Sequence, residues 1–302
     1  MKGIDISKHN PVVDWDKVAA SGIGFVLIRA GYGNDISQKD PKFDEYIKAA
    51  LARGLHVGVY WFSYAVSIAD ALKEAEVCKK VLAPYQGQID FPVAFDYEYD
   101  SINWAVSHKI TVTASADSMA RAFMDSMKAD GWFANLYTNI DFIKSGKFSA
   151  ATIKAYDVWL ADYSGAPDYP CYIQQTGSTG TVPGITGNVD MDVSFRDYPT
   201  MIVAGGYNGY PKQPQTAVKI DTTTEVCFEK GRMYTFYTES GQVPTVTCGT
   251  TNVVALMHCR RDTALGRDYW HITSIGQPGQ ATGIYTAAPG EKPTKRFVAR
   301  VA

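Results

Sequence analysis

The stretch Phe91-Pro92-Val93-Ala94-Phe95-Asp96-Tyr97-Glu98 is a short apolar run that ends in two acidic residues. Such a run is typical of a strand that is buried on both faces. Alternate side chains of a strand point the same way, so we expect Asp96 and Glu98 on one face, with Cα atoms about 6.6 Å apart. Carboxyl groups held this close cannot both ionise freely, and one of them is expected to keep a proton. The alternative is a strand end that carries two solvated acids.

Similar apolar runs alternate with amphipathic stretches up to about residue 198. The runs lie at 25–28, 57–62, 91–95, 135–137 and 158–160. Helices are expected at 46–53, 67–82 and 116–127, because these segments have a helical apolar period and carry Ser caps or terminal Gly residues. Repeated β/α units predict an α/β fold, either a barrel or a doubly wound sheet. The part after residue 156 shows strands but no long helix, which argues against a regular eight-helix barrel.

A turn-rich segment follows, and the pattern then changes to short strands without a helical period. We therefore divide the chain into a domain at 1–200, a linker at 201–215 and a small all-β domain, expected to be a sandwich, at 216–302. Acidic residues outnumber basic ones before residue 206, and basic residues outnumber acidic ones after it. The second part would suit an anionic surface such as a bacterial wall, or it simply has a solvated basic face.

The composition excludes several classes of partner. The net charge of −2 gives no support for bulk binding of nucleic acid. No apolar run reaches the roughly 18 residues of a membrane span, so membrane insertion is not expected. The five cysteines include no CxxC pair, and neither zinc nor another cofactor is expected. The first residues contain no signal-peptide core, which predicts synthesis in the cytoplasm or a leader already removed.

Further acidic residues stand in the first and last apolar runs of the α/β part. Asp5 lies at 3–7, and Asp190 lies at 188–192. The carboxyl ends of barrel strands line one mouth, so we expect Asp5, Asp96, Glu98 and Asp190 to face one pocket. The first and last strands of a closed barrel are neighbours, which would bring Asp5 close to Asp190. This convergence is the main reason to expect catalysis, and paired carboxyl groups are what glycosidases use.

Aromatic residues also stand at or near the strand ends, where their rings could stack on sugars. They are Tyr60, Phe62, Tyr64, Tyr137, Trp159 and Tyr163, and about half of them are expected to be ordinary core residues. Arg29 follows the second strand and could orient a carboxylate of the acidic cluster, although a structural ion pair is an equal alternative.

At this point the sequence resembles the glycoside hydrolase family 25 lysozymes, also called the Chalaropsis type. The matching segments are 3–7, 25–33 (FVLIRAGYG), 40–43, 54–64 (GLHVGVYWFSY), 95–98, 136–139, 159–163 and 187–193. They occur in family order across residues 1 to about 198. The resemblance implies a flattened TIM-like barrel of five β/α units followed by three strands.

The resemblance also implies an activity, which is cleavage of the β-1,4 bond between N-acetylmuramic acid and N-acetylglucosamine in bacterial peptidoglycan. Glu98 would be the general acid, and Asp96 would assist the substrate's N-acetyl group or stabilise positive charge at the anomeric carbon. Asp5 and Asp190 would complete the acidic floor. The close spacing of Asp96 and Glu98 favours net retention, with substrate assistance, a covalent intermediate and inversion left open.

The sequence departs from the family pattern at two positions. Asp192 stands where Asn is common, which adds charge beside Asp190 and places Asp192 among the expected substrate-binding residues. Gln175 stands where an aromatic residue is common, and it is expected to alter a sugar subsite.

The second domain loosely resembles bacterial immunoglobulin-like modules and is expected to bind a cell-wall polymer, with a spacer or dimerisation module as the alternative. The whole chain is expected to be a phage endolysin that acts on the wall after holin-dependent release. A secreted bacterial autolysin, a non-catalytic wall-binding barrel and a metal-dependent hydrolase are the alternatives.

Overall fold

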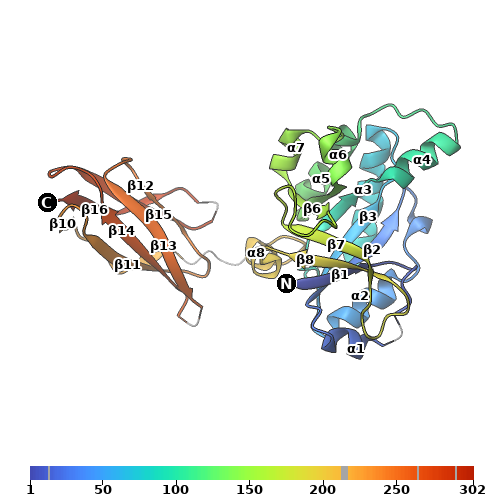
Figure 1. Ribbon diagram of the computed structural model, residues 1–302, viewed down its shortest axis with the longest axis horizontal. Helices are drawn as coiled ribbons and strands as arrows, with labels where there is room; N and C mark the ends of the chain where they lie inside the picture. Colours follow the sequence, from blue (N-terminus) through green and yellow to red (C-terminus); the bar gives the residue numbers. More distant parts are fainter. Residues whose placement is uncertain (13, 212–216, 264, 290) are drawn as a thin grey trace. The chain divides into compact units, whose positions relative to one another are not determined.

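The computed structural model describes residues 1–12, 14–211, 217–263, 265–289 and 291–302. The chain folds into two compact units, Met1–Gln213 and Pro214–Ala302 (Figure 1). Each unit has its own hydrophobic core, and each is described by itself below.

The first unit contains eight strands and eight α-helices among the described residues. The strands are β1 (Lys2–Ile6), β2 (Phe25–Tyr32), β3 (His56–Phe62), β4 (Val93–Asp96), β5 (Ala134–Asn139), β6 (Asp157–Ala161), β7 (Ile173–Gly180) and β8 (Val189–Ser194). The helices are α1 (Trp15–Ala20), α2 (Phe43–Leu51), α3 (Ile68–Leu82), α4 (Tyr99–Ser107), α5 (Ala116–Ala129), α6 (Ile140–Lys144), α7 (Ala150–Ala155) and α8 (Tyr198–Gly205), with short 3-10 helices η1 (Ile36–Gln38) and η2 (Ala83–Tyr85).

The eight strands form a closed barrel in sequence order. Strands β1 to β7 run parallel to their sequence neighbours, whereas β8 runs antiparallel to both β7 and β1. Helices follow each of the first five strands, and β6, β7 and β8 follow one another without a helix between them. The predicted barrel, with five β/α units followed by three strands, is thus confirmed.

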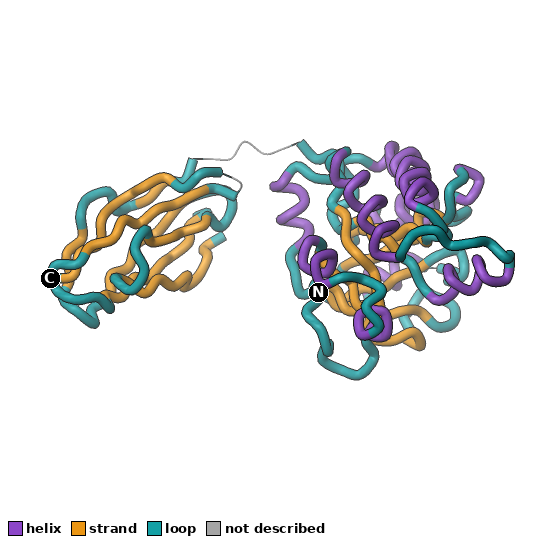
Figure 2. Tube along the Cα trace, turned by 90° about the horizontal axis from the view of Figure 1, so that it is seen from above, coloured by secondary structure: helices purple, strands orange, loops and turns teal. Residues whose placement is uncertain are grey.

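The helices form because their sequences carry both caps and apolar faces. Ser67 and Ser115 accept hydrogen bonds from the first turns of α3 and α5, as expected for N-caps. Both helices bury one face against the barrel in a large core that lies between strands and helices. A smaller core fills the barrel interior with residues that include Phe25, Phe91 and Trp159. Figure 2 shows the strands of this unit enclosed by helices.

The boundary of the first unit differs from the predicted linker at 201–215. Helix α8 continues to Gly205, and Asn208 is fully buried against the barrel. The Asn208 amide donates to the carbonyl oxygens of Ile89 and Phe91 and accepts from the backbone N–H of Phe133. Residues 201–211 therefore belong to the barrel unit, because Asn208 is hydrogen-bonded to the backbone of the segments that lead into β4 and β5. The remaining linker positions, 212–215, lie outside the described residues.

The second unit is all-β, as predicted. Its strands are β9 (Lys219–Ile220), β10 (Val226–Phe228), β11 (Met233–Glu239), β12 (Thr245–Cys248), β13 (Val254–Asp262), β14 (Arg267–Ser274), β15 (Ala281–Ala287) and β16 (Thr294–Val301). They form two four-stranded sheets, β10-β16-β15-β12 and β13-β14-β11-β9. Alternate residues such as Phe236, Trp270 and Phe297 form the core of this unit.

Two further observations concern the described residues of the whole chain. None of their helices is both long and apolar enough to cross a membrane. All five cysteines are free thiols, and of these only Cys78 is buried.

Candidate active site

The four acids singled out in the sequence meet at one mouth of the barrel. Asp5 lies near the end of β1, Asp96 ends β4, and Glu98 follows two residues later at the N-cap of α4. Asp190 lies near the start of β8, which reaches the same mouth because this strand is antiparallel, and it is the register partner of Asp5. The charge of Asp190 acts on both Asp5 and Glu98, and that of Asp96 acts on Asp5, so the four carboxyl groups form one electrostatic cluster.

Asp96 and Glu98 interact directly through their carboxyl groups. Burial, followed by the charge of Glu98, raises the pKa of Asp96 well above its ordinary value, and Arg29 opposes this shift. Burial also raises the pKa of Glu98, which is partly offset by its bond with Asp96. The interaction between the two carboxyl groups thus favours a state in which one of them is protonated. Asp96 is 4% exposed, whereas Glu98 is half-buried and lines an open pocket, so Glu98 is the one that can reach a ligand.

Asp5 belongs to a second group of carboxyls with Asp190 and Asp192. Burial raises the pKa of Asp5 well above its ordinary value, and the charges of Asp192 and Asp190 raise it further. Burial also raises the pKa of Asp192 to about 8. Asp192 was predicted to bind substrate, but it is 2% exposed and its Oδ1 accepts from Trp159 Nε1 at 2.8 Å. We therefore correct this prediction, because Asp192 lies beneath the mouth, where it supports Trp159.

Gln175 connects the acids to the aromatic residues. Its Nε2 donates to Asp5 Oδ2 at 2.7 Å, and its Oε1 accepts from the hydroxyls of Tyr137 at 3.1 Å and Tyr163 at 2.8 Å. The hydrogen bond to Asp5 favours the charged form of that carboxyl and so opposes the effect of burial. The sequence pointed to Gln175 only as a departure from the family pattern, and its place between Asp5 and two tyrosines was not foreseen.

The aromatic residues divide into core and surface groups. Tyr60, Tyr137 and Trp159 are buried in the barrel interior, where Trp159 contacts each of the two tyrosines edge to face. Trp159 is 2% exposed and Tyr60 is 9% exposed, so neither offers a free face to a sugar, contrary to prediction. Tyr163 is 54% exposed beside the acids. Phe62 and Tyr64 are half-buried with ring centroids 5.1 Å apart at the end of β3.

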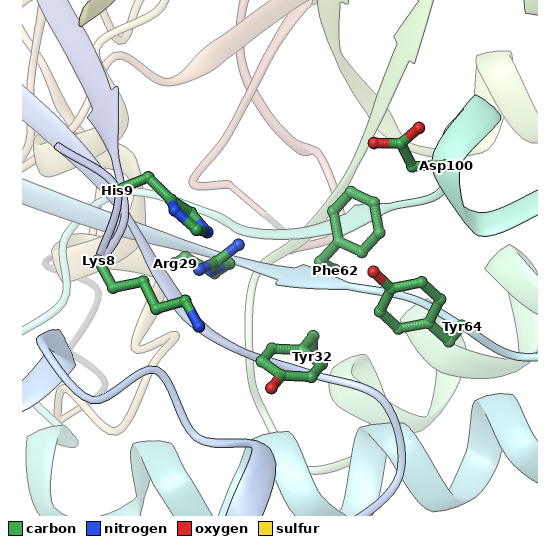
Figure 3. A pocket seen from close by; sticks show the side chains of 7 residues that line it. All are labelled: Lys8, His9, Arg29, Tyr32, Phe62, Tyr64 and Asp100. Carbon is green, nitrogen blue, oxygen red and sulfur yellow. The ribbon is translucent and has the colours of Figure 1, made fainter. Parts of the chain in front are cut away.

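Two pockets flank the acidic cluster. One has a volume of about 520 Å³ and lies over the ends of β5 and β6, with Glu98, Tyr137, Asp141, Asp162 and Tyr163 in its wall. The other has a volume of about 420 Å³ and lies over the ends of β1, β2 and β3. The second pocket is lined by Lys8, His9, Arg29, Tyr32, Phe62, Tyr64 and Asp100 (Figure 3).

Arg29 does not pair with an acid of the cluster. Its Nε donates to Asp40 Oδ2 at 2.8 Å, and both side chains are largely buried. The alternative of a structural ion pair is therefore correct, since Asp40 is the nearer carboxylate, although the charge of Arg29 still lowers the pKa of Asp96. Within the described residues, no group of three or more His, Cys, Asp or Glu side chains is arranged to hold a metal ion.

A closed β/α barrel with paired carboxyl groups at its mouth defines a hydrolase of the glycosidase class. Comparison with known proteins gives the family directly. The family model described as glycosyl hydrolases family 25 matches residues 4–181, and the chain belongs to this family.

Individual relatives come from bacteria and from a phage. The chain is 28% identical over 212 residues to the autolytic lysozyme of Clostridium acetobutylicum, covering 68% of this chain and 58% of that protein. It is 24% identical over 190 residues to the lysozyme of Lactococcus phage mv1, covering 60% of this chain and 91% of that protein.

Among solved structures, the modular autolysin LytC from Streptococcus pneumoniae, in complex with a synthetic peptidoglycan ligand, has 25% identity and a TM-score of 0.56. That match covers 64% of this chain and 46% of LytC. The chain thus spans about half the length of LytC and of the clostridial relative.

Proposed function

We propose that the protein is a lysozyme of the N-acetylmuramidase type, which hydrolyses the β-1,4 bond between N-acetylmuramic acid and N-acetylglucosamine in bacterial peptidoglycan. The observation that carries this proposal is the coupled Asp96–Glu98 pair, in which both pKa values are raised, beside two further carboxyl groups. Family membership and relatives named as lysozymes support the same activity.

In this proposal Glu98 gives its proton to the oxygen of the leaving sugar. The half-buried position of Glu98 in the wall of a pocket supports this role, since a general acid must reach the scissile bond. Asp96 is the more deeply buried of the two, and both carboxyl groups of the pair are charged once its proton has passed through Glu98 to the sugar. As the leaving oxygen departs, positive charge develops at the anomeric carbon, and Asp96 together with Asp190 stabilises it.

Asp5 supports these groups from the floor of the site. Its deep burial and its contact with Gln175 suit a residue that fixes the positions and charges of its neighbours. Tyr163 supplies an exposed ring at the mouth, on which a sugar of the substrate stacks.

The second unit is proposed to bind a cell-wall polymer and so to hold the barrel near its substrate. Its two four-stranded sheets are compatible with an immunoglobulin-like sandwich, which we keep as part of the proposal. We also propose a phage endolysin origin, with a bacterial autolysin as the alternative, since relatives of both kinds occur.

Mass spectrometry of digested peptidoglycan tests the activity. New reducing ends on N-acetylmuramic acid are the expected result. Reducing ends on N-acetylglucosamine would instead mean a glucosaminidase, and freed amino termini would mean an amidase or peptidase. Binding to the wall without release of any product would support a non-catalytic barrel and contradict the proposal.

A further inference from the structure

The pocket over β1 to β3 adjoins the acidic cluster but contains none of its four acids (Figure 3). Phe62, in the wall of this pocket, is the register partner of Asp96. Neighbouring strands lie about 4.8 Å apart, so a ligand in this pocket lies next to the reacting groups. The volume of about 420 Å³ is large enough for a small peptide segment or one sugar.

One side of the pocket has an excess of basic groups. Figure 3 shows Lys8, His9 and Arg29 together there. The Lys8 side chain is exposed, and its ammonium forms no ion pair within the described part of the chain. The ring of His9 lies close enough to Arg29 and Lys8 that, after burial, their charges lower its pKa. Lys8 and Arg29 are the cations of this wall, and an anion between them would reduce the repulsion between their like charges.

Asp40, the buried carboxylate that pairs with Arg29, already accepts three hydrogen bonds. Asp40 is 1% exposed and accepts from Arg29 Nε at 2.8 Å, from the backbone N–H of Lys42 at 2.9 Å and from that of Lys8 at 3.2 Å. Nη2 of Arg29 remains without a hydrogen-bond partner. One buried carboxylate thus balances the guanidinium but leaves the Lys8 ammonium uncompensated.

The other side of this pocket is aromatic. Phe62 and Tyr64 form its wall, and the ring of Tyr64 packs against Trp104 with centroids 5.1 Å apart. Asp100 lies beyond these rings, across from the basic groups (Figure 3). The pocket on the opposite flank of the acids has three carboxylates in its wall, Glu98, Asp141 and Asp162, and no basic residue. The two flanks of the mouth therefore prefer ligand groups of opposite charge.

We propose that the pocket over β1 to β3 binds a carboxylate of the peptide stem that the muramic acid residue of the substrate carries. This inference rests on the proposed muramidase function and deepens it. The stem is attached through the lactyl ether of the muramic ring, within one ring of the cleaved bond, so it leaves the glycan beside the reacting carboxyls. Uncharged sugar polymers lack this group, so the pocket makes the enzyme selective for glycan that bears peptide.

Binding to an inactive protein tests the inference separately from catalysis. The full-length Glu98→Gln protein is titrated calorimetrically with a soluble muramic acid–glucosamine tetrasaccharide that bears stem peptides. A second titration uses the same compound with its carboxylates converted to primary amides. We expect the carboxylate form to bind about fivefold more tightly at low salt, because one partly exposed ion pair contributes a binding free energy of about that size. The difference in affinity should shrink as the salt concentration rises, because salt screens the pair.

Added substitutions assign the effect to Lys8. Lys8→Gln should abolish the difference between the two compounds, whereas Lys8→Arg should preserve it. Lys80→Gln is the matched control, since Lys80 is exposed on α3 and forms no ion pair among the described residues. Equal affinity for the two compounds, equal weakening of both by Lys8→Gln, or no binding of either would overturn the inference. A protein with Glu98 intact that binds in this way but releases no sugar ends would instead refute the muramidase function.

Discussion

Asp5 and Asp190 are register partners in the antiparallel pair of β1 and β8, which closes the barrel. The line along which the first and last strands meet thus runs through the acidic cluster. Strand pairing alone brings these carboxyl groups together, and it makes the charge of Asp190 a cause of the raised pKa of Asp5. The strand pair that closes the barrel therefore also forms one half of the acidic cluster.

Glu98→Gln should abolish most of the activity while the protein stays folded. The amide cannot donate an acidic proton to a leaving oxygen, and a positioned acid contributes about 10²–10⁴-fold in rate. Release of reducing ends from purified peptidoglycan measures the effect. Glu76→Gln, at an exposed position on α3, is the control and should retain wild-type activity. A Glu98→Gln protein with wild-type rates would remove Glu98 from the mechanism.

Gln175→Glu should lower kcat about tenfold. The substituted side chain still accepts from Tyr137 and Tyr163, but it replaces the donor to Asp5 by a second carboxyl group. A hydrogen bond to a charged group contributes about 1.5–3 kcal/mol. Initial rates across substrate concentrations separate kcat from KM, and we expect KM to change less than kcat. An unchanged kcat would mean that Asp5 does not depend on Gln175.

Asp192→Asn should keep activity within about threefold of wild type, because the amide oxygen still accepts from Trp159 Nε1 and the Asp192 carboxyl, with its pKa raised to about 8, is already mostly uncharged at pH 7. Asp192→Leu should instead destabilise the fold by about 1–3 kcal/mol, since it leaves the indole N–H unpaired. Urea unfolding at pH 7 compares the two variants. Equal stability of both would show that the Trp159 hydrogen bond contributes little.

Glu74→Gln should stabilise the protein increasingly as the pH rises. Glu74 is buried under β3, and burial raises its pKa to about 8 although Ser63 and the backbone N–H of Tyr64 donate to it. The folded state therefore holds a proton that the unfolded state releases above about pH 4.5, so stability falls as the pH rises from about 4.5 to 8. The Glu74→Gln variant does not lose this stability, and we expect its free energy of unfolding to exceed that of wild type by something on the order of 3 kcal/mol at pH 8.

Thermal unfolding between pH 4 and pH 8 measures the Glu74 effect. The melting temperature of Glu74→Gln relative to wild type should increase steadily over this range. A difference that stays constant with pH would mean that Glu74 ionises as it does in the unfolded chain.

The sequence predicts the repeated β/α units well because the decisive signals are local, and the family resemblance selects the barrel over a doubly wound sheet. Apolar runs buried on both faces, with helices after the first five, are readable at 25–28 or 91–95 without knowledge of distant contacts. The acids could be found for the same reason, since Asp5, Asp96 and Asp190 lie in or at the end of such runs.

The predictions that failed depend on contacts between distant segments. Trp159 stands at a strand end like Tyr163, yet its indole bonds to Asp192 on another strand and so lies in the core. For Arg29 the sequence left two alternatives open, and only the contact with Asp40, eleven residues later, decides between them. The Trp159 contact depends on how β6 and β8 are placed in the barrel, which one sequence does not show.

The hydrogen bonds of Asn208 also limit where the catalytic unit can be joined to other domains. A hybrid cut at residue 200, where sequence patterns place the domain border, would strip the hydrogen bonds that Asn208 makes beneath β4 and β5. Those strands carry Asp96 and Tyr137 at their opposite ends. A portable catalytic fragment should therefore extend at least through Tyr210, whose ring packs on the interior core, and any new targeting module should be fused beyond that point.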